Sequence, residues 1–422
     1  MIPWKRLTQM IVWAVSMVAF SAILSWPQNR PGTIGIDQTL SDEAQRNTIA
    51  FDALGFLTGN LGADSFFPPG KVADFWGFQY LRDNDPTEMG HNTDFLTRAA
   101  NNMLFVLTGP QRAELAALAR IQVEAINQYA YDRFVLMKAF RRLLAGDVPP
   151  GKPVLSKTEV EAVSADLYLL DGRMSIQRAN VMGGILKALT AGQRAHLDGI
   201  MGRGMLSWPN LPDQLDVRDY AHDVHVAIMT YAGDLFSWYA GSVDADVYFC
   251  PERQGPYFGS FYLKDAPAVG NPGYSIDTAL TGNMGERLLS ILTPGQAALI
   301  TDLVDLQRPN LDEIVDIRRK ISAELRRSRA GQSVNSDDVL SLMDRYGRLD
   351  GEIVYNYAMN FARVGKTLSS GQMDLLKAAR REMIGDLTPQ GAYLYAEPIP
   401  LPAVPNTDFL FEAASKAIGK WR

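Results

Sequence analysis

The sequence predicts an all-α protein made of two tandem long helical hairpin units. Three observations predict this fold. A Leu-Thr/Ser-x-x-Gln signature occurs four times, each time directly before a stretch with helical apolar spacing. Apolar residues recur near every 3.6 positions over long segments of the 422-residue chain. Blocks of sequence also return, in the same order, in the second half of the chain. We expect the two units to fold alike, and they could pack together as an intrachain pseudo-dimer.

The four signatures predict capping boxes that start helices. The Thr or Ser hydroxyl accepts a hydrogen bond from the third helical amide, and the Gln at that position reaches back to the cap amide. Two amides that a helix start leaves without partners are satisfied in this way. We assign the signatures a structural role and no catalytic one. Their residues are Leu107, Thr108, Gln111, Leu189, Thr190, Gln193, Leu292, Thr293, Gln296, Leu368, Ser369 and Gln372.

An internal repeat aligns the two halves of the chain. Residues 67–83 read FPPGKVADFWGFQYLRD and residues 249–265 read FCPERQGPYFGSFYLKD, at an offset of 249 − 67 = 182. The first box recurs at 292 − 107 = 185 and the second at 368 − 189 = 179. Leu170-Asp171-Gly172 recurs as Leu349-Asp350-Gly351, again at 350 − 171 = 179. Order and spacing are both kept, so we infer a duplication.

The first unit is expected to start with a helix over residues 41–60. An aromatic stretch punctuated by Gly and Pro follows, and then a short helix over 92–106. Ala63-Asp64, before the aromatic stretch, matches Ala245-Asp246 of the second unit at the offset of 182. A long helix over 109–145 then ends at two arginines and a glycine, since basic residues suit the negative helix end and glycine suits the C-cap.

The helices after each long helix carry their own start signals. Ser156 with Glu159 predicts a further capping box, in which Leu155 and Val160 pack as a hydrophobic staple. Asn335 with Asp338 is its counterpart in the second unit. We also expect a kink at Pro309 inside the second long helix, because proline removes one hydrogen bond and clashes with the preceding turn.

These elements give four predicted segments. The tail combines an extended proline-rich strap over 397–405 with a short C-terminal helix over 408–421. The boundaries are 1–30 for a signal peptide or membrane anchor, 41–209 for helical repeat 1, 217–386 for helical repeat 2 and 387–422 for the tail.

Composition and the N-terminus favour an exported protein. The formal charge of −6 and the pI near 5.4 lack the basic excess typical of nucleic-acid binders. Lys5 and Arg6 precede an apolar run over residues 10–26, which predicts export to the periplasm. The run could be a cleaved signal or a retained membrane anchor, since 26 − 10 + 1 = 17 residues reach the lower limit for spanning a bilayer. The single Cys250 predicts no internal disulfide.

Two such boxes flanking a helical hairpin resemble the Spy/CpxP family of small exported helical proteins. The spacings are 189 − 107 = 82 and 368 − 292 = 76 residues, and the resemblance covers about residues 107–201 and 292–383. It implies periplasmic, ATP-independent chaperones and envelope-stress regulators, some of which sense or bind metal. It also implies curved dimers whose concave face holds client proteins. In that family the boxes are structural.

Two sets of side chains are candidates for binding. His222 and His225 stand at i and i+3 of an expected helix, and such a pair binds zinc or copper when further ligands join it. A pair without metal is commoner, so we expect no cofactor. Aromatic residues of the repeated stretch could anchor a partner, or else cap the open end of each hairpin core. These residues are Phe75, Trp76, Phe78, Tyr80, Tyr257, Phe258, Phe261 and Tyr262.

One further surface is weighed in the same way. The basic run over 318–329 is expected to be a solvated helix end, with anionic lipid or an acidic partner as the alternative. No phosphate-binding glycine loop, nucleophile elbow or zinc-protease helix motif occurs in the sequence, which favours a non-enzymatic protein.

The leading functional prediction is a periplasmic protein that binds client proteins without catalysis. The first alternative is a structural accessory subunit, attached through residues 10–26 to the periplasmic face of a membrane complex. The second is a metal-responsive sensor that uses His222 and His225. A protein client or a membrane-complex subunit is the expected partner.

Overall fold

The computed structural model describes ten stretches of the chain, with the predicted signal or anchor outside them. Within these stretches the chain is mostly helical with very little sheet, so the all-α prediction is confirmed. The described residues are 42–59, 94–201, 208–241, 243, 246, 279–384, 392–394, 397–399, 403–404 and 406–414.

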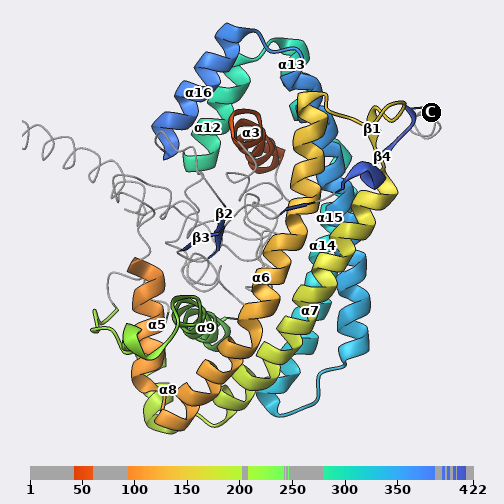
Figure 1. The fold of residues 1–422 in the computed structure, drawn as a ribbon. Coiled ribbons are helices and arrows are strands. Elements are labelled where there is room, and N and C mark those ends of the chain that lie inside the picture. Colours follow the sequence, from red (N-terminus) through yellow and green to blue (C-terminus); the bar gives the residue numbers. More distant parts are fainter. Residues whose placement is uncertain are drawn as a thin grey trace, which may run out of the picture.

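From α5 to α8, and again from α12 to α16, the helices follow one another with short connections (Figure 1). In chain order they are α3 (Asp42–Thr58), α5 (Asp94–Val106), α6 (Gly109–Ala145), α7 (Lys157–Lys187), α8 (Ala191–Ile200), α9 (His222–Ala240), α12 (Ala279–Ile291), α13 (Pro294–Thr301), α14 (Leu303–Arg326), α15 (Ser336–Gly365) and α16 (Ser370–Ile384). Among the described residues, strands form two antiparallel pairs, β1 (Val154–Leu155) with β4 (Phe411–Glu412) and β2 (Ala392–Leu394) with β3 (Glu397–Ile399). Short 3-10 turns span Val217–Asp219, Arg327–Ala330 and Asp408–Leu410.

Four long helices, α6, α7, α14 and α15, form a central spine, in which α7 and α15 have the most extensive contact (Figure 1). At one end of the spine α9 packs against α5, α6 and α8. At the other end α3 packs against α12, α13 and α16. Each of these two helices thus lies mainly on helices from the other half of the sequence.

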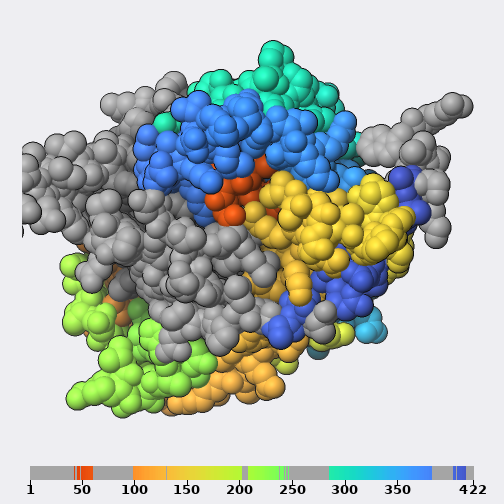
Figure 2. Space-filling model, turned by 45° about the horizontal axis from the view of Figure 1, so that its top comes forward, coloured from red at the N-terminus to blue at the C-terminus, as the bar shows by residue number. Residues whose placement is uncertain are grey.

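The helices α3 and α9 are buried on almost all sides. In α3 the side chains of Ile49, Leu54 and Phe56 are at most 1% exposed, and Figure 2 shows only a small red area of this helix between blue and yellow atoms. In α9 Leu235, Phe236 and Trp238 are equally buried. Both helices also bury polar side chains, among them Asp52 in α3 and Asp234 in α9.

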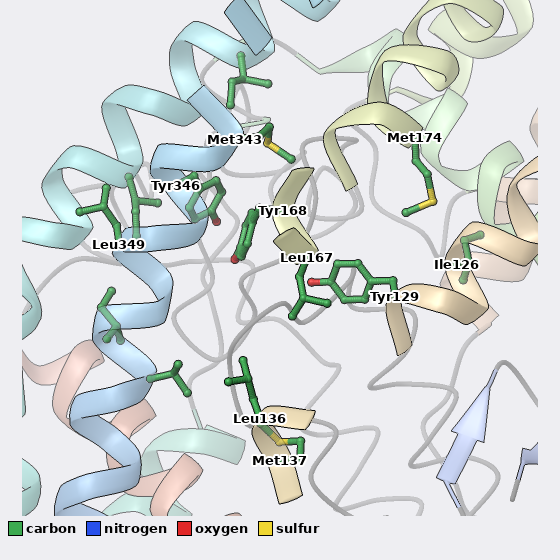
Figure 3. Packing of buried hydrophobic residues seen from close by; sticks show 14 of the residues in the cluster. Ile126, Tyr129, Leu136, Met137, Leu167, Tyr168, Met174, Met343, Tyr346 and Leu349 are labelled. Carbon is green, nitrogen blue, oxygen red and sulfur yellow. The ribbon is translucent and has the colours of Figure 1, made fainter. Parts of the chain in front are cut away.

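The hydrophobic core is one continuous cluster that runs through both halves. Figure 3 shows its centre, where side chains from α6, α7 and α15 meet. The rings of Tyr168 and Tyr346 lie there with their centroids 4.4 Å apart. Burial of this apolar surface, at about 25 cal/mol per Å², is the main stabilising term of such a fold.

The predicted capping box at Ser156 is wrong. Ser156 does precede α7, but its side chain makes no cap hydrogen bond. Its amide donates to the Leu410 carbonyl at 2.7 Å, because the neighbouring Leu155 pairs with Phe411 in the β1–β4 sheet. Asn335, its counterpart, does accept from the Asp338 amide, at 3.4 Å.

Two other local predictions differ from the structure. The second long helix is not continuous but is interrupted at Asp302. Pro309 lies inside α14, and the kink expected there stays a prediction. The predicted C-terminal helix does not start at 408, since Asp408–Leu410 form a 3-10 turn and Phe411–Glu412 form β4. Leu410 and Phe411 are adjacent and both buried, and the turn followed by a strand brings both side chains to the body.

Candidate functional site

The capping boxes meet in two pairs, and the first pair joins the starts of α6 and α8. Gln111 Oε1 accepts from the Thr108 amide at 2.9 Å and from Gln193 Nε2 at 2.8 Å. Gln193 Nε2 also donates to the Val106 carbonyl at the end of α5, at 2.7 Å. The Thr190 hydroxyl accepts from the Gln193 amide, and the Thr190 amide donates to the Gln193 side chain. Each Gln therefore caps its own helix and also fastens a neighbouring one.

The second pair has the same geometry at α13 and α16. Gln372 Nε2 donates to Gln296 Oε1 at 2.8 Å and to the Ile291 carbonyl at 3.0 Å. Gln296 Oε1 accepts from the Thr293 amide at 2.9 Å, and the Ser369 amide donates to Gln372 at 3.0 Å. The Thr, Ser and Gln residues of the four signatures thus act in helix capping and helix attachment, whereas the four leucines pack with the hydrophobic core.

Glycines bring α7 and α15 into close contact. A Cβ on Gly347 would lie 2.6 Å from Ala165 Cα, and one on Gly351 would lie 2.7 Å from Glu161 Cα. On α7, a Cβ on Gly172 would lie 2.9 Å from the side chain of Met343. Gly172 and Gly351 belong to the repeated Leu-Asp-Gly triplet, so the triplets lie where the two central helices touch.

The aspartate of the second triplet is fully buried and hydrogen-bonded. Asp350 Oδ2 accepts from the Tyr168 hydroxyl at 2.8 Å. Tyr168 lies against Tyr346, whose hydroxyl accepts from the fully buried Arg318 at 3.1 Å. Burial, with the Asp350 carboxylate close by, holds the pKa of Tyr168 well above its usual value. The tyrosine therefore stays neutral and keeps its proton for the carboxylate.

The aspartate of the first triplet lies in a second buried ionic group. Arg178 lies 3.9 Å from both Asp171 and Asp234, and its guanidinium is 5.2 Å from the centre of the Tyr231 ring. Burial raises the pKa of Asp171 to about 6, although Arg178 and Arg318 act in the opposite direction. This carboxyl group therefore changes its protonation close to neutral pH.

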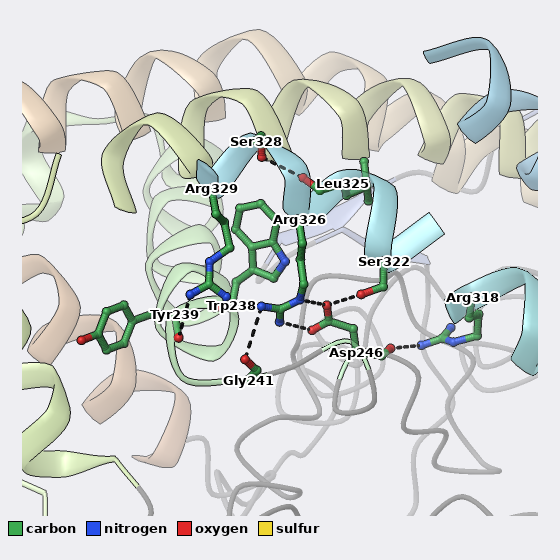
Figure 4. Close-up of polar contacts among 10 residues, drawn as sticks. All are labelled: Trp238, Tyr239, Gly241, Asp246, Arg318, Ser322, Leu325, Arg326, Ser328 and Arg329. Carbon is green, nitrogen blue, oxygen red and sulfur yellow. Dashed lines mark hydrogen bonds and ion pairs between the residues drawn. The ribbon is translucent and has the colours of Figure 1, made fainter. Parts of the chain in front are cut away.

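A third buried ionic group lies under the end of α9 (Figure 4). Arg326 contacts both carboxylate oxygens of Asp246, at 2.5 and 2.7 Å, and the Ser322 hydroxyl donates to the same carboxylate at 2.5 Å. Arg318 donates to the Asp246 carbonyl at 2.9 Å. Such bidentate charge-assisted contacts are the strong class of hydrogen bond, and here they join α14 to the segment after α9.

Arginines also cap the ends of α9 and α3. Arg326 and Arg329 donate to the Trp238 carbonyl at 3.1 and 2.8 Å. Arg141 donates to the Phe56 carbonyl at 2.7 Å, and Arg380 donates to the Gly55 carbonyl at 2.8 Å. The last carbonyls of a helix lack partners and carry partial negative charge, so guanidinium groups stabilise both ends.

The buried ionic groups and the capping arginines together hold the spine, α3 and α9 in place. Each ionic group described above contacts an opposite charge, a hydroxyl or a helix end inside the fold. Breaking a buried ion pair by removing one partner costs about 3–5 kcal/mol, since the other charge stays buried. The network therefore specifies how α7, α9, α14 and α15 fit together.

The two histidines begin α9 and lie close to each other. His222 is exposed and His225 is half-buried, and burial together with His222 lowers the pKa of His225. Within the described residues no group of three or more His, Cys, Asp or Glu side chains is placed to hold a metal ion.

The basic run over 318–329 was predicted to be solvated, and this is wrong for part of it. Arg318 is fully buried and Arg326 is nearly so, whereas Arg319, Lys320 and Arg327 are exposed. The buried arginines meet partners that lie far away in the sequence, Tyr346 and Asp246, which no local pattern indicates.

Several candidates lie outside the described residues. They include Cys250 and the apolar run over 10–26. Among the helices that the structure does describe, none combines the length and apolarity needed to cross a bilayer. The candidate aromatic anchors outside the described part are Phe75, Trp76, Phe78, Tyr80, Tyr257, Phe258, Phe261 and Tyr262.

Comparison with known proteins gave no match. No protein-family model, no curated protein and no solved structure matches the chain. The resemblance to the Spy/CpxP family therefore rests on the boxes and their spacing and stays a prediction.

Sequence reasoning missed the buried ionic groups. The internal repeat could have pointed to them. The Ala-Asp pair that includes Asp246 has a copy in the first half, and Arg326 is the counterpart of Arg141 at 326 − 141 = 185. Gln307 likewise recurs from Gln122 at 307 − 122 = 185, and both accept a tyrosine hydroxyl in the interior. Polar residues that recur at the offsets of the boxes are thus candidates for interior contacts.

Proposed function

We propose that this chain is an exported, non-enzymatic protein that binds other proteins, built from two Spy/CpxP-like units packed as an intrachain pseudo-dimer. Export and the class of protein rest on the N-terminal apolar run and on the four boxes. The pseudo-dimer rests on contacts between elements that occupy equivalent places in the repeat.

Equivalent elements support the pseudo-dimer. The starts of α7 and α15 are separated by 336 − 157 = 179 residues, the offset of the Leu-Asp-Gly triplets, and these two helices pack on each other. The two Gln–Gln bonds are both 2.8 Å long. Arg141 over the Phe56 ring and Arg326 over the Trp238 ring form a further equivalent pair of contacts.

The exchange of first helices supports one rigid body rather than two independent units. In this interpretation α3 and α9 are equivalent, since each opens its unit, and each fills the core of the other unit. Pulling the units apart would expose both helices, whose apolar side chains are almost fully buried. Such a frame holds two equivalent surfaces at a constant separation, which suits a bivalent binding protein.

One observation carries the binding role. Ile121 on α6 and Leu306 on α14 occupy equivalent positions, at 306 − 121 = 185, and are 68% and 38% exposed. Exposed charged residues lie beside them, Arg120 at the first site and Asp305 at the second. An apolar anchor with a charged rim is typical of protein-binding surfaces.

An aggregation assay tests the proposal. The mature protein, at an equimolar ratio, should suppress aggregation of a reduced or denatured model client, measured by light scattering. Ile121→Asp combined with Leu306→Asp should remove at least half of this suppression. Val217→Asp is the matched control, because Val217 is 62% exposed but lies on the Val217–Asp219 turn. Wild-type protein that gives no suppression, or equal loss with the control, would sink the proposal.

A further inference from the structure

Val404 and residues 406–412, the described part of the C-terminal segment, lie at the corner where α6 ends and α7 begins. Figure 1 shows β4 of this segment beside β1 at that corner, and Figure 2 shows its deep-blue atoms on the surface next to orange and yellow ones. The corner itself is built from α6, the following turn, β1 and α7, which are continuous in sequence and contact one another.

The backbone of the segment adds a strand to the corner. Leu155 pairs with Phe411 and Val154 pairs with Glu412 in antiparallel register. The Ser156 amide donates to the Leu410 carbonyl at 2.7 Å. Strand addition of this kind is a common way in which proteins bind extended peptides.

Two apolar side chains anchor the segment. Leu410 is 0% and Phe411 is 2% exposed. Phe409, the residue before them, is 47% exposed. Val404 is also buried at the start of the segment. Burial of apolar surface is the main favourable term in such contacts, so Leu410 and Phe411 are the main apolar contributors to docking of the segment.

Arg142 at the end of α6 binds polar side chains of the segment. Its guanidinium donates to Asp408 Oδ1 at 2.7 Å and to Thr407 Oγ1 at 2.9 Å. The same guanidinium lies 5.2 Å from the centre of the Phe411 ring. Lys138, one turn earlier on α6, donates to the Val404 carbonyl. One arginine thus recognises a hydroxyl, a carboxylate and an aromatic ring at fixed spacing.

We propose that this corner is a peptide-docking site and that residues 404–412 occupy it as a separable ligand of the same chain. The site takes a peptide with the pattern Thr-Asp-x-Leu-Phe, which forms a 3-10 turn over Asp-x-Leu and a strand from Phe onward. Because the segment is tethered to its site, an effective concentration on the order of 1 mM keeps even a peptide with a Kd near ~100 µM docked about nine times in ten. A second copy of the chain carries the same ligand, so it can fill a site whose own segment has left.

Fluorescence anisotropy tests the proposal with the full-length chain. A labelled peptide of residues 403–414 is titrated against the wild type and against Leu410→Asp, which disables the segment and leaves the corner intact. We expect the variant to bind the peptide at least tenfold more tightly than the wild type. Phe409→Asp is the matched control and should behave like the wild type, because Phe409 points to solvent. Adding Arg142→Ala to the first variant should weaken peptide binding at least fivefold.

The outcomes separate a docked ligand from a part of the core. Peptide binding by Leu410→Asp that is no tighter than wild-type binding, with helical circular dichroism retained, would overturn the proposal, and so would loss of helical structure in this variant. Hydrogen exchange of the wild type gives a second measurement. Amides of residues 407–412 should exchange at least tenfold faster than those of α15, and exchange only in step with α15 would also overturn it. A wild-type dimer at high concentration that Leu410→Asp abolishes would support the site, filled by a second copy.

Discussion

Replacing Gly347 by alanine should destabilise the protein, because the new methyl group meets backbone. Its Cβ would lie 2.6 Å from Ala165 Cα, 2.9 Å from the Ser164 carbonyl and 3.0 Å from the Ala165 amide. Backbone atoms cannot rotate away as a side chain can. Ordinary contact begins at 3.4 Å, so α15 and α7 must separate by at least 3.4 − 2.6 = 0.8 Å at this point.

The two opposing energies can be compared. Alanine in a helix interior gains about 1 kcal/mol over glycine. Overpacking of a close contact costs about 1–3 kcal/mol, and moving the helices apart also weakens the Tyr168–Asp350 hydrogen bond, which contributes about 1.5–3 kcal/mol as a bond to a charged group. We expect a net loss of about 1–3 kcal/mol in the free energy of unfolding, measured by urea denaturation followed by circular dichroism.

Gly184→Ala is the matched control on α7. A Cβ at Gly184 meets no atom within 4 Å, so this variant should gain about 0.5–1 kcal/mol. If Gly347→Ala gains stability to the same extent, the close contact between α7 and α15 does not exist as described.

Three other perturbations test the interior contacts. Gln193→Ala should lower the free energy of unfolding by about 1–3 kcal/mol, since the Val106 carbonyl and Gln111 lose a donor, and a loss below about 0.5 kcal/mol in chemical denaturation would contradict the paired boxes. Arg326→Lys should cost a similar ~1–3 kcal/mol in the same assay because lysine cannot contact both oxygens of Asp246, whereas the exposed Arg319→Lys should stay within about 0.5 kcal/mol of wild type. The folded pKa of Asp171, about 6, lies above the usual 3.8, so the folded state binds a proton that the unfolded state releases; its contribution to stability should fall as pH rises through this window and stay level above it, and Asp171→Asn should flatten that part of the measured pH profile.

Much of the helical architecture could be predicted from the sequence, because helix boundaries depend on atoms only a few residues apart. Thr108 and Gln111 cap α6 through contacts three residues apart, and Gly146 ends it with φ of 76°, a conformation that suits glycine. The Asn335 cap of α15 follows the same rule. Apolar periodicity likewise identified the buried stripes of these helices.

The candidate sites fared differently, because their partners lie far apart in the sequence. A solvated end was expected for the run that holds Arg318, yet this arginine lies beside Tyr346 and the Asp246 backbone. Ser156 has the residue type of a cap, but its amide donates to the Leu410 carbonyl instead. A charge or a hydroxyl can be satisfied in several ways locally, and packing selects among them.

The sequence by itself determined most of the helices, the helix starts that carry the Thr/Ser–Gln boxes, and the residues that recur between the two halves. Only the tertiary structure decided that α3 and α9 lie on helices from opposite halves, that the glycine of each Leu-Asp-Gly triplet lies against the other central helix, and that the C-terminal segment sits beside β1. The physical reason is range. Capping and periodicity act within one or two helical turns. The choice of partner for a buried surface is a competition among all surfaces that the folded chain brings together.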